Sequence, residues 1–439
     1  MSPFFVKAIQ LLMSLSLLIV LHELGHFIPA RIFKTRVEKF FLFFDVKFAL
    51  FKKKIGDTTY GIGWLPLGGY VKISGMIDES MDTEQMKQPA QEWEFRAKPA
   101  WQRLIIMLGG VTVNLILGFL IYMMILFVWG KNTLTTEELP LGFQPSPIAQ
   151  EIGFEEGDQL VSIDGKILDN VMDINRQLFL RPLKKVTVKR ASKNIEVIAI
   201  PEGIGQKMFE TGEMMPLTPL LPALLDSIKP NSPAAHASLQ HNDRLVSVND
   251  TSIVHWGDFQ ELMEGKKQQT LSLVIERNQR MQTMEIITTP EGTLGVYPRT
   301  DSIVYTNEKL SLNESIIEGF DYGYWTLYDY VSQFQYIFTQ KGASQLGGFG
   351  AIGNMFPGTW NWKGFWSSTA LISIILAFMN ILPIPALDGG HVMFLAYEIV
   401  TGRKPNDKFM EYAQVTGFFL LMALVLYANG NDVVRYLFN

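Results

Sequence analysis

The pentapeptide His22-Glu23-Leu24-Gly25-His26 has the residue types and the spacing of a zinc-binding helix. Histidines at positions i and i+4 of a helix share one face, with Cβ atoms about 6 Å apart, so two imidazoles can bind one Zn²⁺. Glu23 lies about 100° further round the helix, from where its carboxylate can reach a water activated by the metal. The pattern predicts hydrolytic chemistry, with His22 and His26 as ligands and Glu23 as general base.

The motif lies near the end of a hydrophobic stretch that runs from about Phe4 to Phe33. A glutamate inside a hydrocarbon span costs about 2.5–3.5 kcal/mol, so such residues usually have a function. The structural alternative is a polar helix end that extends to the membrane surface. A second alternative for the whole stretch is a cleaved signal peptide. Positive charge follows this stretch instead of preceding it, which favours a retained anchor.

A catalytic zinc site needs a third protein ligand and leaves the fourth position for water. Asp388 is the only carboxylate between Lys363 and Glu398, in a stretch that is otherwise largely apolar. Pro383 and Pro385 precede it and remove backbone donors, and the glycines after it permit a sharp turn. We therefore expect Asp388 to be the third ligand.

Two alternatives remain at this position. His391 follows Asp388 closely and is the second choice as ligand. Asp388 itself could serve only as a helix cap or as part of a loop at the membrane interface.

The elements that must position these groups are membrane helices. Of the 439 residues 48% are hydrophobic and 18% are charged, whereas soluble proteins have roughly 25% charged residues. Besides the first stretch, three others reach the roughly 20 apolar residues that a bilayer requires: Leu104–Trp129, Gly364–Leu387 and Tyr412–Asn431. The net charge of −5 gives no basic surface for nucleic acid, and the absence of cysteine excludes thiolate sites.

Lysine and arginine are distributed unequally around these stretches. Residues 31–103 contain 13 of them, whereas the 20 residues after the second stretch contain only Lys131. Because positive residues stay in the cytoplasm, we expect both termini and the long middle region outside the cytoplasm. In a bacterial inner membrane this means the periplasm, with the active site near the cytoplasmic side.

The middle region contains an internal repeat, residues 146–166 and 232–251, in which a Ser-Pro turn precedes an Asp and an alternating strand. Both copies resemble PDZ domains of the bacterial, circularly permuted kind. The resemblance implies binding of extended C-terminal peptides by strand addition. A pair of spacers, or a filter against bulky substrates, is the alternative. The aromatic-rich stretch that follows is expected either at the membrane interface or as a core helix packed on the second copy.

The paired motifs HExxH and Asn380-x-x-Pro383-x-Pro385-x-Leu-Asp388-Gly-Gly resemble those of the site-2 proteases, the intramembrane zinc metalloproteases. Two PDZ-like domains between the second and third spans are similar to the bacterial RseP (regulator of sigma-E protease) branch. The resemblance implies that His22, His26 and Asp388 bind zinc and that Glu23 is the base. Asn380 would hold the substrate, with Pro383 and Pro385 beside it.

Residues 59–76 look like the family's membrane-re-entrant β-hairpin, with Gly68 and Gly69 at its turn. Such an edge strand could pair with the backbone of an unwound substrate helix. The alternative is a cytoplasmic hairpin without substrate contact. Asn114, the most polar residue inside the second span, either clamps substrate or only packs. The chain departs from the branch at Ile375, where a second asparagine is frequent, and at 347–353, where a Gly-Pro-Ile-Gly motif is common.

The predicted fold is an α-helical integral membrane protein with four transmembrane helices, a re-entrant β-hairpin and two inserted mixed α+β PDZ-like domains. In chain order we expect transmembrane helix 1 over 1–33, a cytoplasmic region over 34–100, helix 2 over 101–130, PDZ-like domains over 131–215 and 216–305, an aromatic-rich juxtamembrane segment over 306–362, helix 3 over 363–397, and helix 4 with the tail over 398–439.

The predicted activity is hydrolysis of peptide bonds within transmembrane segments of pre-trimmed single-span proteins. By the resemblance these would be anti-sigma factors, in a stress response, or signal-peptide remnants. The expected partners are the substrate helix, membrane lipid and C-terminal peptides. Three rivals predict other features. An ion pathway would show repeated spans, a PDZ scaffold would need no Glu23, and a protease for soluble peptides would lack a ligand inside a span.

Overall fold

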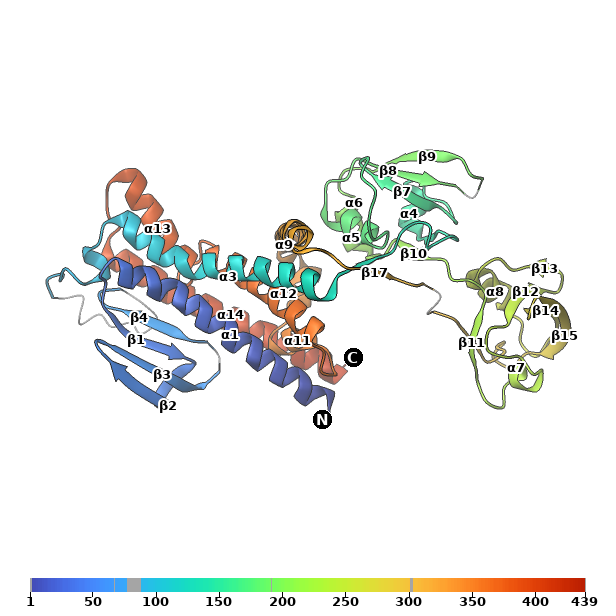
Figure 1. Ribbon diagram of the computed structural model, residues 1–439, viewed down its shortest axis with the longest axis horizontal. Helices are drawn as coiled ribbons and strands as arrows, with labels where there is room; N and C mark the ends of the chain where they lie inside the picture. Colours follow the sequence, from blue (N-terminus) through green and yellow to red (C-terminus); the bar gives the residue numbers. More distant parts are fainter. Residues whose placement is uncertain (1, 67, 77–87, 191, 301–302, 439) are drawn as a thin grey trace. The chain divides into compact units, whose positions relative to one another are not determined.

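The computed structural model describes residues 2–66, 68–76, 88–190, 192–300 and 303–438. They form two compact units (Figure 1). The membrane unit comprises Met1–Gly130 and Lys309–Asn439, and the inserted unit comprises Lys131–Glu308. The inserted unit begins with β5 (Lys131–Thr133) and ends with β17 (Thr306–Glu308), and these two strands pair antiparallel. The chain therefore enters and leaves the inserted unit at neighbouring points.

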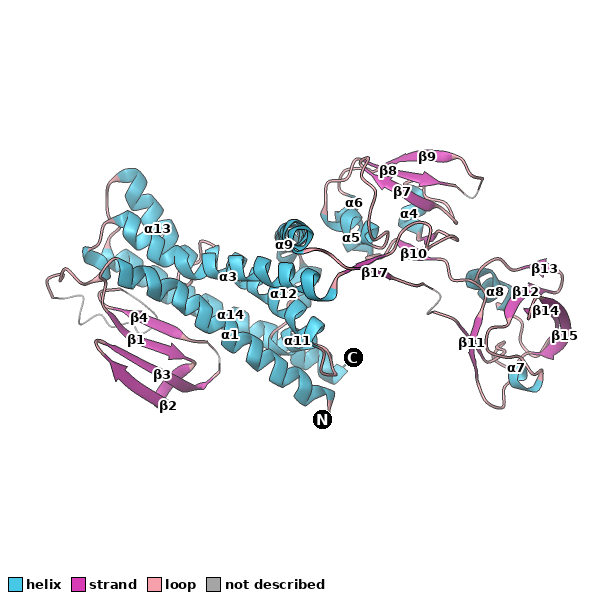
Figure 2. Cartoon of the chain, viewed as in Figure 1, coloured by secondary structure: helices cyan, strands magenta, loops and turns pink. Residues whose placement is uncertain are grey.

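Four helices among the described residues are long and apolar enough to cross a membrane, which confirms the four predicted spans (Figure 2). They are α1 (Pro3–Ile32), α3 (Ala100–Trp129), α12 (Trp362–Ile381) and α14 (Asp407–Phe438). α3 contacts both α1 and α12 along much of its length. The other described helices of the membrane unit are η1 (Phe95–Ala97), α9 (Leu312–Phe334), η2 (Gln335–Phe338), α10 (Gln340–Gln345), α11 (Phe349–Asn354) and α13 (Asp388–Thr401).

The third span is shorter than the sequence predicted, and the segment over 363–397 is not one helix. α12 ends at Ile381, six residues before the expected end, and α13 begins at Asp388. Pro383 and Pro385 lie in the break between the two helices, where their missing N–H groups prevent a continuous helix. The break brings Asp388 to the first position of a new helix.

A four-stranded sheet adjoins α1, and it corrects the predicted hairpin over 59–76. Its strand order is β2 (Phe44–Ile55), β3 (Thr58–Leu65), β1 (Val37–Leu42) and β4 (Tyr70–Ile73). β3 and β4 do not pair with each other, because β1 lies between them, parallel to β3 and antiparallel to β4. β2 supplies the crossover that a parallel pair requires. The hairpin of this sheet is β2–β3, and β4 is an edge strand.

The inserted unit contains the succession helix, strand, helix, strand, strand twice, with the extra helix α6 in the first copy and the extra strand β13 in the second. The first copy has α4 (Pro147–Glu151), β7 (Gln159–Ile163), α5 (Asp173–Leu180), β8 (Lys185–Lys189), β9 (Ile195–Ala199) and α6 (Ile204–Thr211). The second has α7 (Pro233–His236), β12 (Arg244–Val248), β13 (Thr251–Ser252), α8 (Trp256–Met263), β14 (Thr270–Arg277) and β15 (Arg280–Ile287). Short strands complete the unit: β6 (Phe143–Pro145) with β10 (Leu217–Pro219), and β11 (Leu225–Ile228) with β16 (Val296–Pro298).

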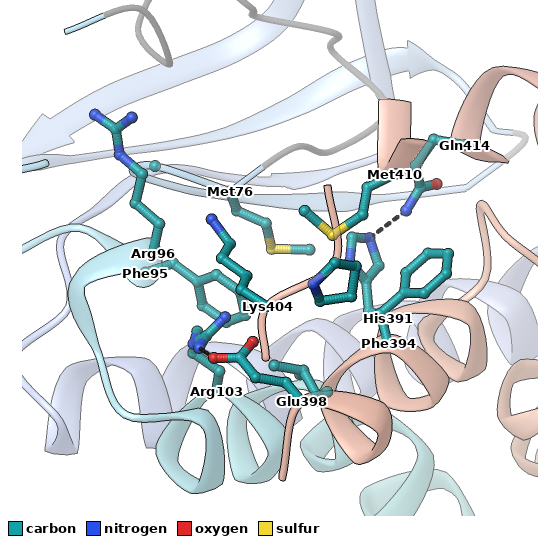
Figure 3. Close-up of a pocket in the computed structure, with 13 residues that line it drawn as sticks. Met76, Phe95, Arg96, Arg103, His391, Phe394, Glu398, Lys404, Met410 and Gln414 are labelled. Atoms are coloured by element: carbon teal, nitrogen blue, oxygen red, sulfur yellow. Dashed lines mark hydrogen bonds and ion pairs between the residues drawn. The ribbon is translucent and has the colours of Figure 1, made fainter. Parts of the chain in front are cut away.

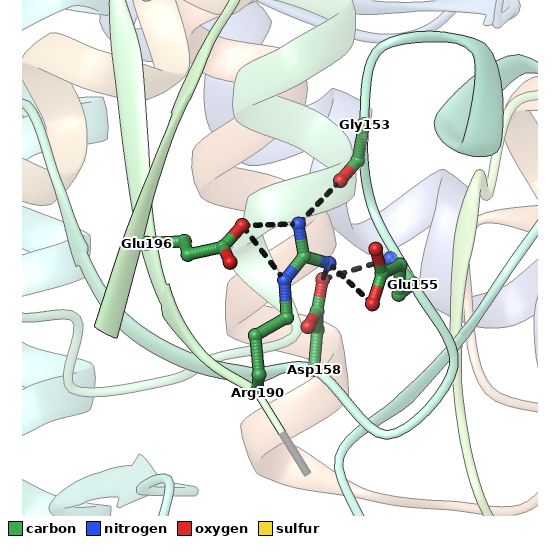
Figure 4. A network of polar contacts seen from close by, with 5 residues as sticks. All are labelled: Gly153, Glu155, Asp158, Arg190 and Glu196. Carbon is green, nitrogen blue, oxygen red and sulfur yellow. Dashed lines mark hydrogen bonds and ion pairs between the residues drawn. The ribbon is translucent and has the colours of Figure 1, made fainter. Parts of the chain in front are cut away.

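Each copy encloses its own hydrophobic core and one equivalent buried ion pair. In the first copy Asp158, just before β7, lies 2.8 Å from Nη1 of Arg190 (Figure 4). In the second copy Asp243, just before β12, lies 2.6 Å from Nη2 of Arg277. The repeated contact supports a common origin of the two copies.

The aromatic-rich helix α9 belongs to the membrane unit and packs on the membrane helix α3. Cβ atoms on Gly319 and Gly323 would lie 2.6 Å from Cα of Met123 and 3.0 Å from Cδ1 of Phe119. Because only glycine leaves room for this approach, α9 lies against the backbone of α3 at Gly319 and against the ring of Phe119 at Gly323.

Candidate active site

The site begins with an unusually close approach of α1 and α3. Cβ atoms on Gly25 and Gly109 would each collide with the other's carbonyl oxygen. A Cβ on Gly110 would collide with Nε2 of His26 and would lie 2.6 Å from Cε1 of His22. The three glycines therefore allow both imidazoles of α1 to lie directly against the backbone of α3.

Asp388 reaches the two imidazoles from the turn between α12 and α13. A Cβ on Gly389 would collide with the carbonyl of Leu382, and one on Gly390 would lie 2.7 Å from Cα of Pro385. The Gly-Gly pair thus permits α13 to fold back against the proline-containing turn. The prolines interrupt the helix and the glycines permit the sharp turn, as their positions in the sequence predicted.

Three donor atoms meet in this place at nearly equal distances. Nε2 of His22 and Nε2 of His26 are 3.3 Å apart. Oδ2 of Asp388 lies 3.3 Å from the first and 3.4 Å from the second. Within the part of the chain that the structure describes, no hydrogen bond satisfies this buried carboxylate oxygen.

Zinc fits this arrangement. Ligand atoms at two corners of a tetrahedron with bonds of about 2.05 Å are about 3.3 Å apart, and zinc prefers imidazole and carboxylate ligands. A cation bound here would also remove the repulsion between the lone pairs of these three donor atoms, which otherwise face one another. The side chains have exposed fractions of 14%, 8% and 16% for His22, His26 and Asp388, so the site keeps a narrow opening.

Among the described residues one other group has metal-like composition, namely Glu156, His255 and Asp258. In this group Nδ1 of His255 accepts from the backbone N–H of Asp258 and caps α8. Nε2 therefore carries the hydrogen and donates to Glu156 at 2.8 Å. Because a neutral imidazole has one lone pair, and the cap occupies it, this cluster is structural.

Glu23 lies between the histidine face of α1 and the edge strand β4. The backbone of Val71 in β4 donates a hydrogen bond to the Glu23 carboxylate. A Cβ on Gly69 would collide with Ile19 and would lie 3.7 Å from Cγ of Glu23. Gly68 lies instead against the ring of Phe44. Of the two predicted turn glycines, Gly69 is therefore the one beside the glutamate.

The remaining predicted residues lie around the turn. Asn380 is in the last turn of α12, and Pro385 approaches Gly417 of α14. His391, the alternative ligand, faces a separate pocket, where its Nε2 lies 2.7 Å from Nε2 of Gln414 (Figure 3). It is not in the three-atom cluster.

Asn114 contacts the cluster directly, which its position in the sequence did not predict. Its side-chain amide lies 3.1 Å from Nδ1 of His22, on the side away from the cluster. No motif signalled this contact, because it depends on how α1 and α3 are aligned.

Comparisons with known proteins agree with this geometry. The profile of Peptidase family M50 matches residues 10–424. Regulator of sigma E protease of Haemophilus influenzae is 28% identical, covering 97% of this chain and 98% of its own length. Regulator of sigma-E protease RseP of Escherichia coli is 26% identical, covering 97% of each chain. A putative zinc metalloprotease of Campylobacter jejuni is 28% identical, covering 96% and 91%.

The family match extends over nearly the whole chain, across the helices that carry both halves of the cluster. The relatives are named as zinc metalloproteases or as sigma-E regulator proteases. The chain therefore belongs to Peptidase family M50, the site-2 proteases, and is a zinc metalloprotease with membrane helices.

Proposed function

We propose that the protein hydrolyses peptide bonds inside transmembrane segments, with His22, His26 and Asp388 as zinc ligands. The observation that carries this proposal is the triangle of three donor atoms, 3.3–3.4 Å on each side, formed by side chains of two membrane-associated elements. A protease for soluble peptides would have no reason to build its ligands into a hydrophobic helix.

Zinc bound here would supply a water of lowered pKa and would polarise the scissile carbonyl. Residues of the chain itself orient the groups and transfer the proton. Nδ1 of His26 donates to the carbonyl of Ile106, which holds the imidazole in place. The Glu23 carboxylate takes the proton of the attacking water and then delivers it to the leaving nitrogen. Val71 orients that carboxylate through its backbone N–H.

The substrate would bind as an added strand at the edge of β4. A transmembrane helix must unwind before hydrolysis, and its freed amides cost several kcal/mol each in lipid unless they are paired. β4 is the outermost strand of its sheet and contacts α1 beside Glu23. We therefore assign substrate contact to Gly69, and to Asn380, Pro383 and Pro385 in the turn that delivers Asp388. In this proposal the β-sheet enters the membrane from the cytoplasmic side.

The inserted unit would select substrates by size. Its two copies are proposed to be PDZ-like domains on the periplasmic side of a bacterial inner membrane, as the distribution of lysine and arginine favours. There they would exclude bulky external domains and could bind C-terminal peptides. Two relatives are named regulators of sigma E. We therefore propose an anti-sigma factor, trimmed beforehand by another protease, as the natural substrate.

Replacement of Glu23 by glutamine tests the proposal. Full-length protein in liposomes would be given a single-span peptide without an external domain, and zinc would be measured in the same preparation. We expect zinc content to be retained and cleavage to fall by about 100- to 10,000-fold, the contribution of a general base. Glu92→Gln, at an exposed carboxylate, serves as the matched control. Full cleavage by the Glu23 variant would contradict the assignment of the base.

A further inference from the structure

The two histidines of the cluster differ in the hydrogen-bond partner of Nδ1, the ring nitrogen that points away from the cluster. Nδ1 of His26 lies 2.8 Å from the backbone carbonyl of Ile106. A carbonyl oxygen can only accept, so this Nδ1 carries hydrogen, and the lone pair of Nε2 faces the cluster. The tautomer of His26 is thus fixed by the backbone of α3.

Nδ1 of His22 lies 3.1 Å from a side chain instead, the amide of Asn114. An amide can donate or accept, depending on which of its ends faces the ring. If Nδ2 faced the ring, Nδ1 of His22 would accept and Nε2 would carry the hydrogen. Nε2 would then have no lone pair for a metal.

The opposite orientation of the amide suits zinc. With Oδ1 facing the ring, Nδ1–H of His22 donates to it and Nε2 is free to bind. In the orientation with Nδ2 facing the ring, Oδ1 of Asn114 is buried without any hydrogen-bond partner among the described residues. Because the two ends of an amide have the same shape, rotation by 180° needs no movement of α3.

We propose that Asn114 is a positioning residue that accepts the Nδ1 hydrogen of His22 and so fixes the tautomer that binds zinc. This rests on the proposed ligation of zinc by His22. It replaces both roles considered for Asn114 from the sequence, clamping a substrate and packing alone. The residue is 1% exposed, so it cannot clamp a substrate, and its polar contact is with a ligand, so it does more than fill space.

The structure also holds Asn114 itself in place. The hydroxyl of Ser373 in α12 donates to the backbone carbonyl of Asn114 at 2.7 Å. Ile106, Gly110 and Asn114 follow one another at single-turn intervals on the face of α3 that meets α1. One face of α3 therefore supplies a carbonyl for His26, space for both rings and an amide for His22.

Two substitutions separate positioning from packing. Asn114→Leu keeps the side-chain volume and removes the acceptor, whereas Asn114→Asp keeps an acceptor oxygen. Zinc affinity of the purified full-length protein would be measured by competition with a chelator, together with the visible spectrum after replacement of zinc by Co²⁺. We expect Asn114→Leu to weaken zinc binding about 10- to 100-fold, as for other partners of metal-binding histidines, and Asn114→Asp to retain it.

Two controls make the outcome decisive. Gln10→Leu changes a buried amide of α1 whose oxygen also has no partner among the described residues, and whose nitrogen bonds to backbone carbonyls and not to a zinc ligand, so zinc affinity should not change. His22→Ala should abolish tight binding. Unchanged affinity in Asn114→Leu with loss in His22→Ala would overturn the positioning role alone. Unchanged affinity in both would overturn the proposed ligand set. If Asn114→Leu fails to fold, loss of affinity in a folded Asn114→Asp would equally contradict the proposal.

Discussion

Two carboxylates with little exposure to solvent, one in each unit, show opposite ways of placing negative charge inside a protein. Asp158 in the inserted unit is 2% exposed and contacts the guanidinium of Arg190 at 2.8 Å. Arg190 also binds Glu196 and the carbonyl of Gly153, at 2.8 and 2.9 Å (Figure 4). Asp388 in the membrane unit is 16% exposed and meets the imidazoles of the cluster.

The difference lies in where the counter-charge comes from. Arg190 is always charged, so the carboxylate of Asp158 is balanced by the chain itself. Imidazoles must be neutral to bind a metal, so the neighbours of Asp388 bring no charge when they act as ligands. The charge of Asp158 is therefore balanced as soon as the inserted unit folds. The charge of Asp388 is not, so the cluster in the membrane unit is complementary to a cation. This contrast predicts separate consequences when each carboxylate is disturbed.

The largest effect is expected for Asp388→Asn. The amide keeps the shape of the side chain but loses the negative charge that a zinc ligand supplies, so zinc content should fall to about a tenth or less and cleavage to background. Metal analysis and cleavage of a single-span peptide would measure both. Unfolding of the inserted unit, followed by hydrogen exchange, should not change. Normal zinc content would direct attention to His391 as the third ligand.

The sequence predicted features that depend on residues close together in the chain better than features that depend on contacts between distant segments. The motif of α1 carries two donors within one helical turn, and Asp388 stood out because its stretch has no other carboxylate. The order of the sheet was not predictable in this way. The pairing of β1 between β3 and β4 arises from contacts between separate segments, and alternation along one strand does not reveal its neighbours.

The contacts of Asn114 and Arg190 illustrate the same limit. Asn114 meets a histidine 92 positions away, and Arg190 meets an aspartate 32 positions away. Asn114 was conspicuous in the sequence as an amide inside a span, whereas no pattern distinguished Arg190 from the other arginines. The partner could be identified only once the helices and strands were aligned in space.

A smaller effect is expected for Arg190→Met, which removes the internal counter-charge of Asp158. Leaving a buried carboxylate without its partner should destabilise the first copy by about 3 kcal/mol. Chemical unfolding of the full-length protein, with hydrogen exchange to locate the change, would measure it. Arg277→Met is the matched variant, because Arg277 holds Asp243 in the second copy at 2.6 Å. Zinc content and cleavage of a short substrate should stay normal in both, and loss of zinc would contradict the independence of the two carboxylates.

The smallest effect is the pH dependence of that destabilisation. Burial raises the pKa of Asp158 above its ordinary value, against the opposing effect of Arg190, and without the arginine the pKa rises further. Between the unfolded value of about 3.9 and the higher folded value, the folded state holds a proton that the unfolded state lacks. The folded Arg190→Met variant is therefore stabilised as the pH falls through this window. Its deficit in unfolding free energy relative to the parent protein should shrink by about 1 kcal/mol on going from about pH 7 to about pH 5.

Adding Asp158→Asn to the variant should abolish the trend, since no carboxyl remains to take up the proton. A deficit that stays constant with pH would mean that the guanidinium stabilises this copy by its shape and hydrogen bonds, and that charge balance at Asp158 contributes little.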